Sequence, residues 1–337
     1  MKRPTIADIA RRAGVTKAAV SFALNGQPGV SESTRGRIMQ IAEELGWQPN
    51  SAARALSDGR SGVFGLVIDR PASTLGVEPF FMQLISGMQA ELSREHIALL
   101  FTMAQGPTAE AELYREWWAQ RRVDGVFLVD LQINDSRVPL LEDLGLPTVV
   151  VGSPRGSGSL PAVWTDDGRS AEMVVEYLVG LGHRRLARVT GMAHYWHTKI
   201  RTDAFAAVAR RHGVSATFVE ADYTSEHGAE ATRELLRAPE PPTAILYDND
   251  VMALAGLTVV QRAGLRVPAD VSIVAWEDSA LCELVHPSLT ALHRDIPAHG
   301  AQAARQLIAL TRHVRLIDLR DPSPVLVRRA STTAVDT

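Results

Sequence analysis

The sequence predicts a small all-α N-terminal domain followed by a larger α/β body of two doubly wound parallel-sheet lobes. Three observations predict this. Short helical patterns separated by turn signals fill the first 47 residues, and beyond Gly62 apolar runs of four to seven residues alternate with helical patterns. The chain of 337 residues is also longer than one ordinary hydrophobic core requires.

The charge is unevenly distributed along the chain. Residues 1–60 hold nine Lys or Arg and five Asp or Glu, a balance of +4, and the net charge of -3 leaves -7 for the remainder. A basic head on an acidic body indicates a polyanionic partner for the head. The start has no apolar run of signal-peptide length, and no run of about 18 apolar residues occurs, so we expect a cytoplasmic protein. The single cysteine, Cys282, fits a reducing compartment.

The first helix of the head is predicted to begin after Thr5, which forms a capping-box pattern with Asp8, and to end near Ala13. Gly14 then permits a left-handed turn. The second helix is expected from Lys17 to Leu24, with Thr16 as its cap.

A third helix is predicted to begin at "VSEST", with Ser31 or Ser33 as its cap, and to run to Gly46. Three short helices with a glycine turn between the first two form a helix-turn-helix, whose second helix enters the DNA major groove. The residues 1–47 are therefore expected to be a DNA-binding domain.

On a helical period, Val20 and Leu24 of the second helix face inward, and an opposite stripe faces outward. Phe22 and Ala18 on this stripe are expected to contact thymine methyl groups, and Lys17 a guanine or a phosphate. The alternative for Phe22 is core packing against the third helix. Side chains expected to bond phosphates are Thr5, Thr16, Ser21 and Asn25.

From Thr5 to Leu56 the chain resembles the lactose-repressor (LacI/GalR) family of bacterial regulators. The resemblance rests on "TIADIARRAGVTKAAVS", "NGQPGVSESTRGRI", "AEELGWQPN" and "ARAL" in unbroken order. It implies that the first, second and sixth residues of the recognition helix choose the operator, and these are Lys17, Ala18 and Phe22. This set departs from the polar or basic residues familiar there, so no known operator sequence is carried over.

Residues 48–61 are predicted to form a hinge, with Asn50 capping a short helix "SAARALSD". At seven or eight residues it falls below the roughly 12–15 residues that are marginally stable alone. The resemblance implies that two such helices pair in the minor groove across a dimer axis, with Leu56 wedged into a base step. Ala53 would allow close pairing, and Arg54 would approach phosphates. The alternative is a plain linker with Leu56 packed on its own domain.

The body, residues 62–337, shows seven apolar runs typical of buried parallel strands: "VFGLVI", "IALLF", "GVFLV", "TVVV", "LARVT", "TAILY" and "VSIVA". The resemblance implies a fold similar to periplasmic binding proteins, in which the chain crosses three times between lobes. We expect lobe 1 at about 62–161 and 293–323, and lobe 2 at about 162–292 and 324–337.

Ligands of open parallel sheets bind beyond the carboxyl ends of the strands, where this sequence places carboxylates and amides. For Asp130 the alternative is a place at the surface. Asp250 is favoured as a helix cap, and Phe81 and Trp117 are favoured as core residues. Trp196 offers a flat apolar face for a sugar ring. The resemblance supports, as effector-binding positions, Asp69, Phe80, Arg201, Tyr223, Asn249 and Glu277. The family often has Asp where Glu277 stands.

Signals for catalysis or metal binding are weak. "RGSGSLP" has Pro161 where a dinucleotide loop needs its third glycine, and no Walker loop or nucleophile elbow occurs. His194 and His197 of "HYWH" lack a third ligand, and "DND" lacks the glycine and glutamate of a calcium loop. We therefore expect no enzyme activity, no cofactor and no metal.

The prediction is a ligand-responsive transcriptional regulator, a repressor of carbohydrate-utilisation genes controlled by a small sugar-like effector. A homodimer on a pseudo-palindromic operator is expected, cytoplasmic and nucleoid-associated when bound, without membrane contact. The tail "ASTTAVDT" has no heptads for a tetramer helix. The alternatives are a carbohydrate-binding transport component, a sugar-modifying enzyme, neither with a DNA role, and a regulator responding to a non-sugar metabolite.

Overall fold

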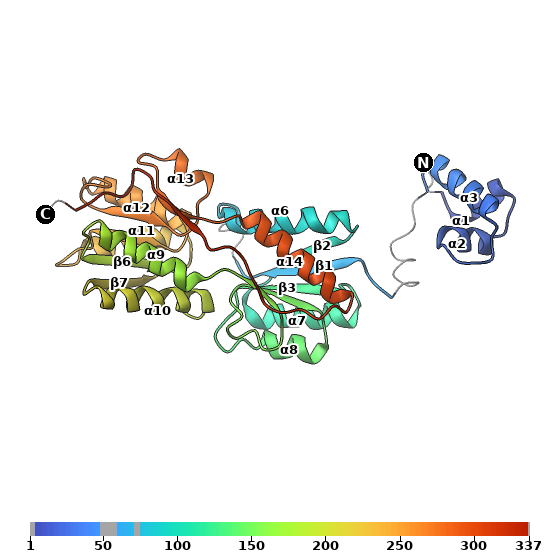
Figure 1. The fold of residues 1–337 in the computed structure, drawn as a ribbon, viewed down its shortest axis with the longest axis horizontal. Coiled ribbons are helices and arrows are strands. Elements are labelled where there is room, and N and C mark those ends of the chain that lie inside the picture. Colours follow the sequence, from blue (N-terminus) through green and yellow to red (C-terminus); the bar gives the residue numbers. More distant parts are fainter. Residues whose placement is uncertain (1–3, 48–58, 71–74, 336–337) are drawn as a thin grey trace. The chain divides into compact units, whose positions relative to one another are not determined.

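The computed structural model describes residues 4–47, 59–70 and 75–335, in two units, Met1–Ser61 and Gly62–Thr337 (Figure 1). The described head consists of α1 (Ile6–Ala13), α2 (Lys17–Leu24) and α3 (Glu32–Glu44). Their inward faces form one small core around Ile9, Val20 and Ile38, all fully buried. The expected bounds of the helices thus agree with the structure to within two residues, as does the inward stripe of α2.

The helix ends of the head follow their sequence signals. Thr5 donates from N and Oγ1 to Asp8 Oδ2 (3.0 and 2.7 Å), and Thr16 Oγ1 accepts from Ala19 N (3.1 Å). Ser31, the first of the two candidates, caps α3. Arg35 of α3 donates to the carbonyl oxygens of Ala23 (3.1 Å) and Gln27 (2.9 Å) at the end of α2, which ties the second helix to the third.

The first lobe of the body is a six-stranded parallel sheet with the order β11-β5-β4-β3-β1-β2. Its strands are β1 (Val63–Ile68), β2 (Ala98–Met103), β3 (Gly125–Val129), β4 (Thr148–Val151), β5 (Ala162–Trp164) and β11 (Leu319–Arg320). Two helices, α6 (Pro79–Arg94) and α14 (Ile296–Thr311), share a core with one face, and α7 (Gly106–Ala119) and α8 (Arg137–Leu144) with the other.

Both faces of β1 are buried, which explains why the sequence of a buried strand is a continuous apolar run. Phe64, Leu66 and Ile68 point into the core under α6 and α14, and Val67 points into the core under α7 and α8. Trp117 fills that second core, as expected, and its ring lies where a Cβ at Gly65 would stand.

The second lobe has the sheet order β12-β10-β9-β8-β6-β7, parallel except for the antiparallel pair of β10 and β12. Its strands are β6 (Arg185–Thr190), β7 (Ser215–Glu220), β8 (Ala244–Tyr247), β9 (Ser272–Ala275), β10 (Thr290–His293) and β12 (Val325–Val327). One face packs against α9 (Asp167–Gly180) and α10 (Trp196–Arg211), the other against α11 (Ser225–Leu236) and α12 (Asp250–Arg262); α13 (Ala280–Leu284) is a short helix beyond β9 (Figure 1).

The two sheets with helices on both faces confirm the predicted fold class. The lobe boundaries differ in detail. β5 still belongs to the first sheet, so the first crossing follows Trp164 rather than residue 161. β10 ends at His293 in the second sheet while α14 packs on the first, and the third crossing lies between β11 and β12. The three-residue β5 is too short to give a strand pattern of its own.

The helices α6 and α14 approach so closely that only glycine fits between them. A Cβ at Gly87 would lie 1.9 Å from the Pro297 carbonyl oxygen, and one at Gly300 would lie 2.1 Å from that of Leu84. This contact holds the middle of α6 against the start of α14. No helix in the described part of the chain is long and apolar enough to cross a membrane.

Candidate functional site

The outward face of α2 is a continuous exposed surface. Lys17 and Ala18 are exposed, Ser21 is half-buried, and Phe22 is 46% exposed. Phe22 lies outside the head core, with its ring 3.5 Å from the Cβ position of Gly29, so the alternative that placed it in the core is wrong. An apolar ring held outward between polar neighbours suits contact with base edges in a groove.

The side chains expected to bond phosphates have local roles as well. The hydroxyls of Thr5 and Thr16 serve in the two helix caps and lie at exposed positions, and Asn25 Nδ2 lies 3.5 Å from Ser21 Oγ. The cap partners hold these groups at the start of α1 and at both ends of α2. The hinge positions Asn50, Ala53, Arg54 and Leu56 lie outside the described residues.

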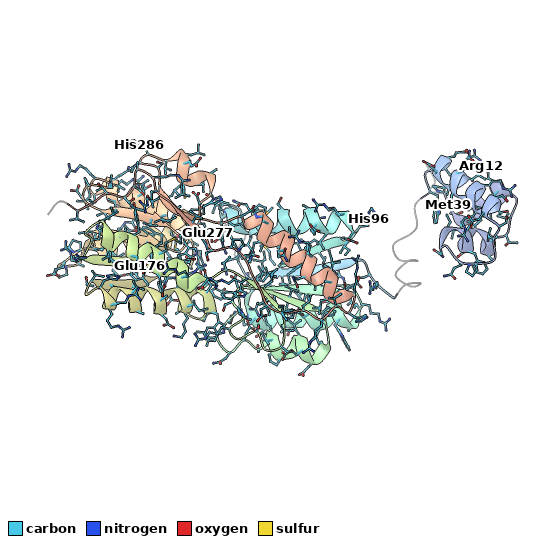
Figure 2. The ribbon with its side chains drawn as sticks, in the orientation of Figure 1. Arg12, Met39, His96, Glu176, Glu277 and His286 are labelled. Carbon is cyan, nitrogen blue, oxygen red and sulfur yellow. The ribbon has the colours of Figure 1, made fainter. Side chains whose placement is uncertain are left out.

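A cavity of about 90 Å³ opens in the body where strand ends of both lobes face each other. The first lobe contributes residues after β1, β3 and β4 and the start of α6. The second contributes the start of α10 and residues after β7, β8 and β9, and Figure 2 shows Glu277 where the two lobes meet. The predicted effector-binding residues that line it are Phe80, Trp196, Arg201, Tyr223, Asn249 and Glu277.

Asp69 is the exception, because it does not line the cavity. Successive side chains beyond β1 alternate in direction, and its neighbour Arg70 enters instead. Arg70 is buried, donates from Nη1 to the Tyr195 hydroxyl (2.9 Å) and pairs with Asp130 at 2.8 Å. The sequence interpretation chose the strand end that contributes to the cavity, but the side chain that lines the cavity there is that of Arg70.

Each arginine of the cavity wall is paired with a carboxylate. Arg201 is bonded through Nε and Nη2 to Asp167 (3.1 and 3.0 Å), and its guanidinium lies 4.0 Å from the Trp276 ring centre. Arg294 donates to Glu277 at 2.7 Å. The extra methylene of Glu277, compared with the Asp common in the family, therefore reaches a partner in this protein.

A fourth pair joins the lining Asp248 to an arginine of the sheet. Arg188 on β6 donates from Nε and Nη2 to the two carboxylate oxygens of Asp248, both at 2.7 Å, and neither side chain is exposed. Asp248 also accepts from the Gly191 backbone (2.9 Å), so it fixes the turn after β6 beside the cavity.

Asn249, rather than Asp250, caps α12. Its Oδ1 accepts from Met252 N (2.8 Å), while Nδ2 donates to the Tyr223 carbonyl oxygen (3.1 Å). Asp250 is instead the first residue of the helix, buried and hydrogen-bonded by Ser279. Burial raises the pKa of Asp250 to about 6.

Two residues of the wall adopt left-handed backbone conformations. Asp130 has φ of 50° and Tyr223 has φ of 70°. The buried Arg137 donates to the Asp130 carbonyl oxygen (2.9 Å), and Arg137 is itself held by Asp135 and Glu110. Such conformations persist where surrounding contacts determine them, and they are found at ligand sites.

Several charged or titratable residues that line the cavity were not included in the predicted site, among them Arg70, Glu78, His197, Arg294 and Asp130, the last noted only as a strand end. Arg294 follows β10, a strand whose pattern was not recognised. His197 Nε2 lies 2.7 Å from the Tyr223 hydroxyl, and burial together with nearby Arg201 lowers its pKa well below the usual range. Burial raises the pKa of Glu78 to about 7.

The lobes are also tied by backbone contacts at one side of the cavity. Trp196 N donates to the Leu131 carbonyl oxygen (2.9 Å), and Ile133 N donates to that of His194 (2.8 Å). The Trp196 ring lies under Arg155 at 4.9 Å and beside Gly156, where a Cβ would touch its Nε1. A ligand here would touch both lobes, so it would act on their relative angle.

A helix-turn-helix with an exposed second-helix face, joined to a two-lobed body around a polar cavity, defines a ligand-responsive DNA-binding regulator. Residues 5–50 match the family of bacterial regulatory proteins named after lacI, and residues 175–332 match the periplasmic binding protein-like domain. The chain is 32% identical over 323 residues to the HTH-type transcriptional regulator CelR of Thermobifida fusca, covering 91% of this chain and 92% of that protein. The chain belongs to the LacI family of transcriptional regulators.

Solved structures agree with this assignment. A LacI family transcriptional regulator from Bifidobacterium animalis subsp. lactis is 34% identical with a TM-score of 0.76, covering 82% of this chain and all of the other. The structure of a CelR–cellobiose complex is 28% identical with a TM-score of 0.73, covering 98% of this chain and all of the other.

Proposed function

We propose that this protein is a homodimeric repressor of carbohydrate-utilisation genes whose operator binding is controlled by a small sugar in the cavity. The observation that carries the proposal is the cavity wall, which combines carboxylate and amide groups with the rings of Phe80, Tyr223 and Trp196. Hydroxyl groups bond to the former and the apolar face of a sugar ring stacks on the latter. The similarity to a regulator solved with cellobiose supports the same ligand class.

A dimer is supported by the edge of the first lobe. β2 is the edge strand of its sheet, and it exposes Phe101 (39%) and Met103 (45%), with Met82 of α6 exposed at 55%. Apolar side chains on an unpaired edge favour a protein partner. We expect a dimeric mass by light scattering at micromolar concentration, and a tetrameric mass would contradict the proposal.

Effector control requires that the ligand and DNA are linked. The lobe angle that the sugar stabilises either allows or prevents pairing of the hinge segments. By linkage, the sugar changes DNA affinity by the same factor by which DNA changes sugar affinity. Leu56→Ala is expected to weaken specific DNA binding and to reduce DNA bending while leaving the melting temperature of the body unchanged. Unchanged DNA bending by Leu56→Ala in a gel-phasing assay would refute the insertion of Leu56 into a base step.

The ligand class is tested by a thermal-shift screen of sugars, sugar phosphates, nucleobases and amino acids. A ligand at 100 times its Kd stabilises the body by about 2.7 kcal/mol. Arg201→Lys keeps the charge but loses the planar fork to Asp167, so it is expected to lose most of the sugar-induced shift. Lys199→Ala, on the exposed side of the same helix, is the matched control and is expected to keep it. A shift with nucleobases or amino acids and none with carbohydrates would support the non-sugar alternative.

A further inference from the structure

One carboxylate of the cavity stands apart from the others. Glu78 precedes α6, is only 6% exposed and lines the cavity. Its Oε1 accepts a long hydrogen bond from Asn249 Nδ2 (3.4 Å), and its Oε2 has no hydrogen-bond partner among the described residues. A buried carboxylate oxygen without a donor is costly unless a ligand supplies one.

The remaining charges of the wall are already matched. Each lining arginine has a carboxylate within 3.1 Å, and the lining Asp248 has a buried arginine. The two lining histidines also have partners, since His197 bonds to the Tyr223 hydroxyl and His299 Nδ1 lies 2.6 Å from Asp321. The ion pairs are Arg70–Asp130, Arg201–Asp167, Arg294–Glu277 and Arg188–Asp248.

The pairing of the wall charges determines whether the cavity accepts an anionic, a cationic or a neutral ligand. A phosphate or carboxylate on the ligand would add a charge to a wall whose arginine charges are already balanced by carboxylates, and it would meet the carboxylate of Glu78 at close range in a site of low dielectric. The buried Nε of Arg70, which has no hydrogen-bond partner among the described residues, can donate to a neutral hydroxyl oxygen without separating an ion pair. An ammonium group would be opposed by the Arg70 guanidinium, which is packed between the rings of Tyr223 and Tyr195 nearby. Hydroxyl groups carry donors without charge.

Building on the proposed sugar-responsive function, we propose that Glu78 selects a neutral, hydroxyl-rich effector by accepting hydrogen bonds from its hydroxyl groups, and that anionic sugars are rejected. Glu78 belongs to the first lobe and its neighbour Asn249 to the second. Asn249 is held by Met252 N and the Tyr223 carbonyl oxygen, so its Nδ2 faces Glu78 in a fixed orientation. A hydroxyl bound at Glu78 therefore lies at the seam between the lobes.

Proton linkage follows from the surroundings of Glu78. The charged groups that act on it are Arg70, which favours its ionised form, and Asp130 and Asp250, which oppose it, and burial raises its pKa to about 7. Hydroxyl donors stabilise the carboxylate form, so the sugar binds the deprotonated protein more tightly. With a pKa near 7, the apparent Kd is expected to be about tenfold weaker at pH 6 than at pH 8.

The test uses isothermal titration calorimetry with the full chain and matched sugars at pH 6 and pH 8. The probes are glucose and cellobiose as neutral sugars, with glucuronate, glucose 6-phosphate and cellobionate as anionic counterparts at both pH values. Glucosamine is the cationic counterpart at pH 6, where its amino group is protonated. We expect a neutral sugar to bind at least tenfold more tightly than its charged counterparts, with the tenfold loss of affinity at pH 6. Tighter binding of an anionic or amino counterpart would overturn the proposal.

Glu78→Gln separates this proposal from the proposed function. Because glutamine keeps the shape and loses the charge, as the protonated carboxyl does, the variant is expected to lose the pH dependence and to bind the neutral sugar at least tenfold more weakly at pH 8. Glu95→Gln, at the exposed far end of α6, is the control and should behave as the wild type. If the pH dependence persists in Glu78→Gln, the role of Glu78 is refuted while the sugar-responsive function stands. If no sugar of either charge binds, the proposed function itself fails.

Discussion

Replacing Asp248 with asparagine is expected to destabilise the body severely, because it leaves the guanidinium of Arg188 buried without a counter-charge. Both side chains are fully buried, and two bonds of 2.7 Å join them. Breaking such a pair costs roughly 3–5 kcal/mol. The loss of the acceptor for Gly191 N adds to this in the same direction.

The assay is urea unfolding followed by tryptophan fluorescence, supported by thermal melts. For a body of this size the expected loss corresponds to a fall in Tm on the order of 10 °C. The control is Asp270→Asn. Asp270 also binds one arginine, Arg266, through both carboxylate oxygens (3.1 and 3.0 Å), but on the surface, where Arg266 is 75% exposed. Because solvent screens this pair, we expect no measurable change.

A double variant separates charge burial from packing. Arg188→Met with Asp248→Leu removes both charges together, so it is expected to recover most of the stability that Asp248→Asn loses. If Asp248→Asn and Asp270→Asn lower Tm equally, or if the double variant is no more stable than Asp248→Asn, the reasoning from buried charge is refuted.

Three further predictions concern the α6–α14 contact, the buried carboxylate after β8 and the recognition helix. Gly87→Ala is expected to destabilise the body by roughly 1–3 kcal/mol or more in urea unfolding, because its Cβ would overlap the backbone of Pro297. Gly180→Ala is the control and should not destabilise the body, because the space at its Cβ position is open. Burial raises the pKa of Asp250 from 3.8 to about 6, so ionising this carboxyl group lowers the free energy of unfolding as the pH rises through that window. Asp250→Asn should therefore raise the free energy of unfolding by about 3 kcal/mol above pH 7 and by under about 1 kcal/mol at pH 4. Equal increases at the two pH values would contradict the assignment. Phe22→Ala should weaken binding to selected DNA in a gel-shift assay with little effect on Tm, while Met39→Ala, equally exposed on α3 (labelled in Figure 2), should leave binding unchanged.

The helices of the head were predictable because their signals are local. Thr5, Thr16 and Ser31 are caps within three residues of the groups they bond, and the apolar stripe of each helix repeats with the helical period. The buried strands of the body were predictable for the same reason, since β1, β3 and β4 coincide with the apolar runs that predicted them.

The composition of the cavity was predictable only in part. Tyr223 and Asn249 follow from strand-end position and family pattern, and Arg201, which lies within α10, follows from the family pattern alone. Asp69 does not line the cavity, because the direction of a side chain past the end of a strand depends on how the loop leaves the sheet. Glu78 has no signal in its neighbourhood beyond the proline that starts α6.

The sequence by itself determined the helix-turn-helix, the two-lobed α/β class and six of the residues that line the cavity, because each depends on periodicity, caps or motifs within a few positions. Only the tertiary structure decided which charges are paired, because partners such as Arg188 and Asp248, or Arg201 and Asp167, are distant in the chain and meet only when strands and helices pack. Glu78 Oε2 has no hydrogen-bond partner among the residues that the structure describes, and this too results from long-range packing that no local pattern encodes.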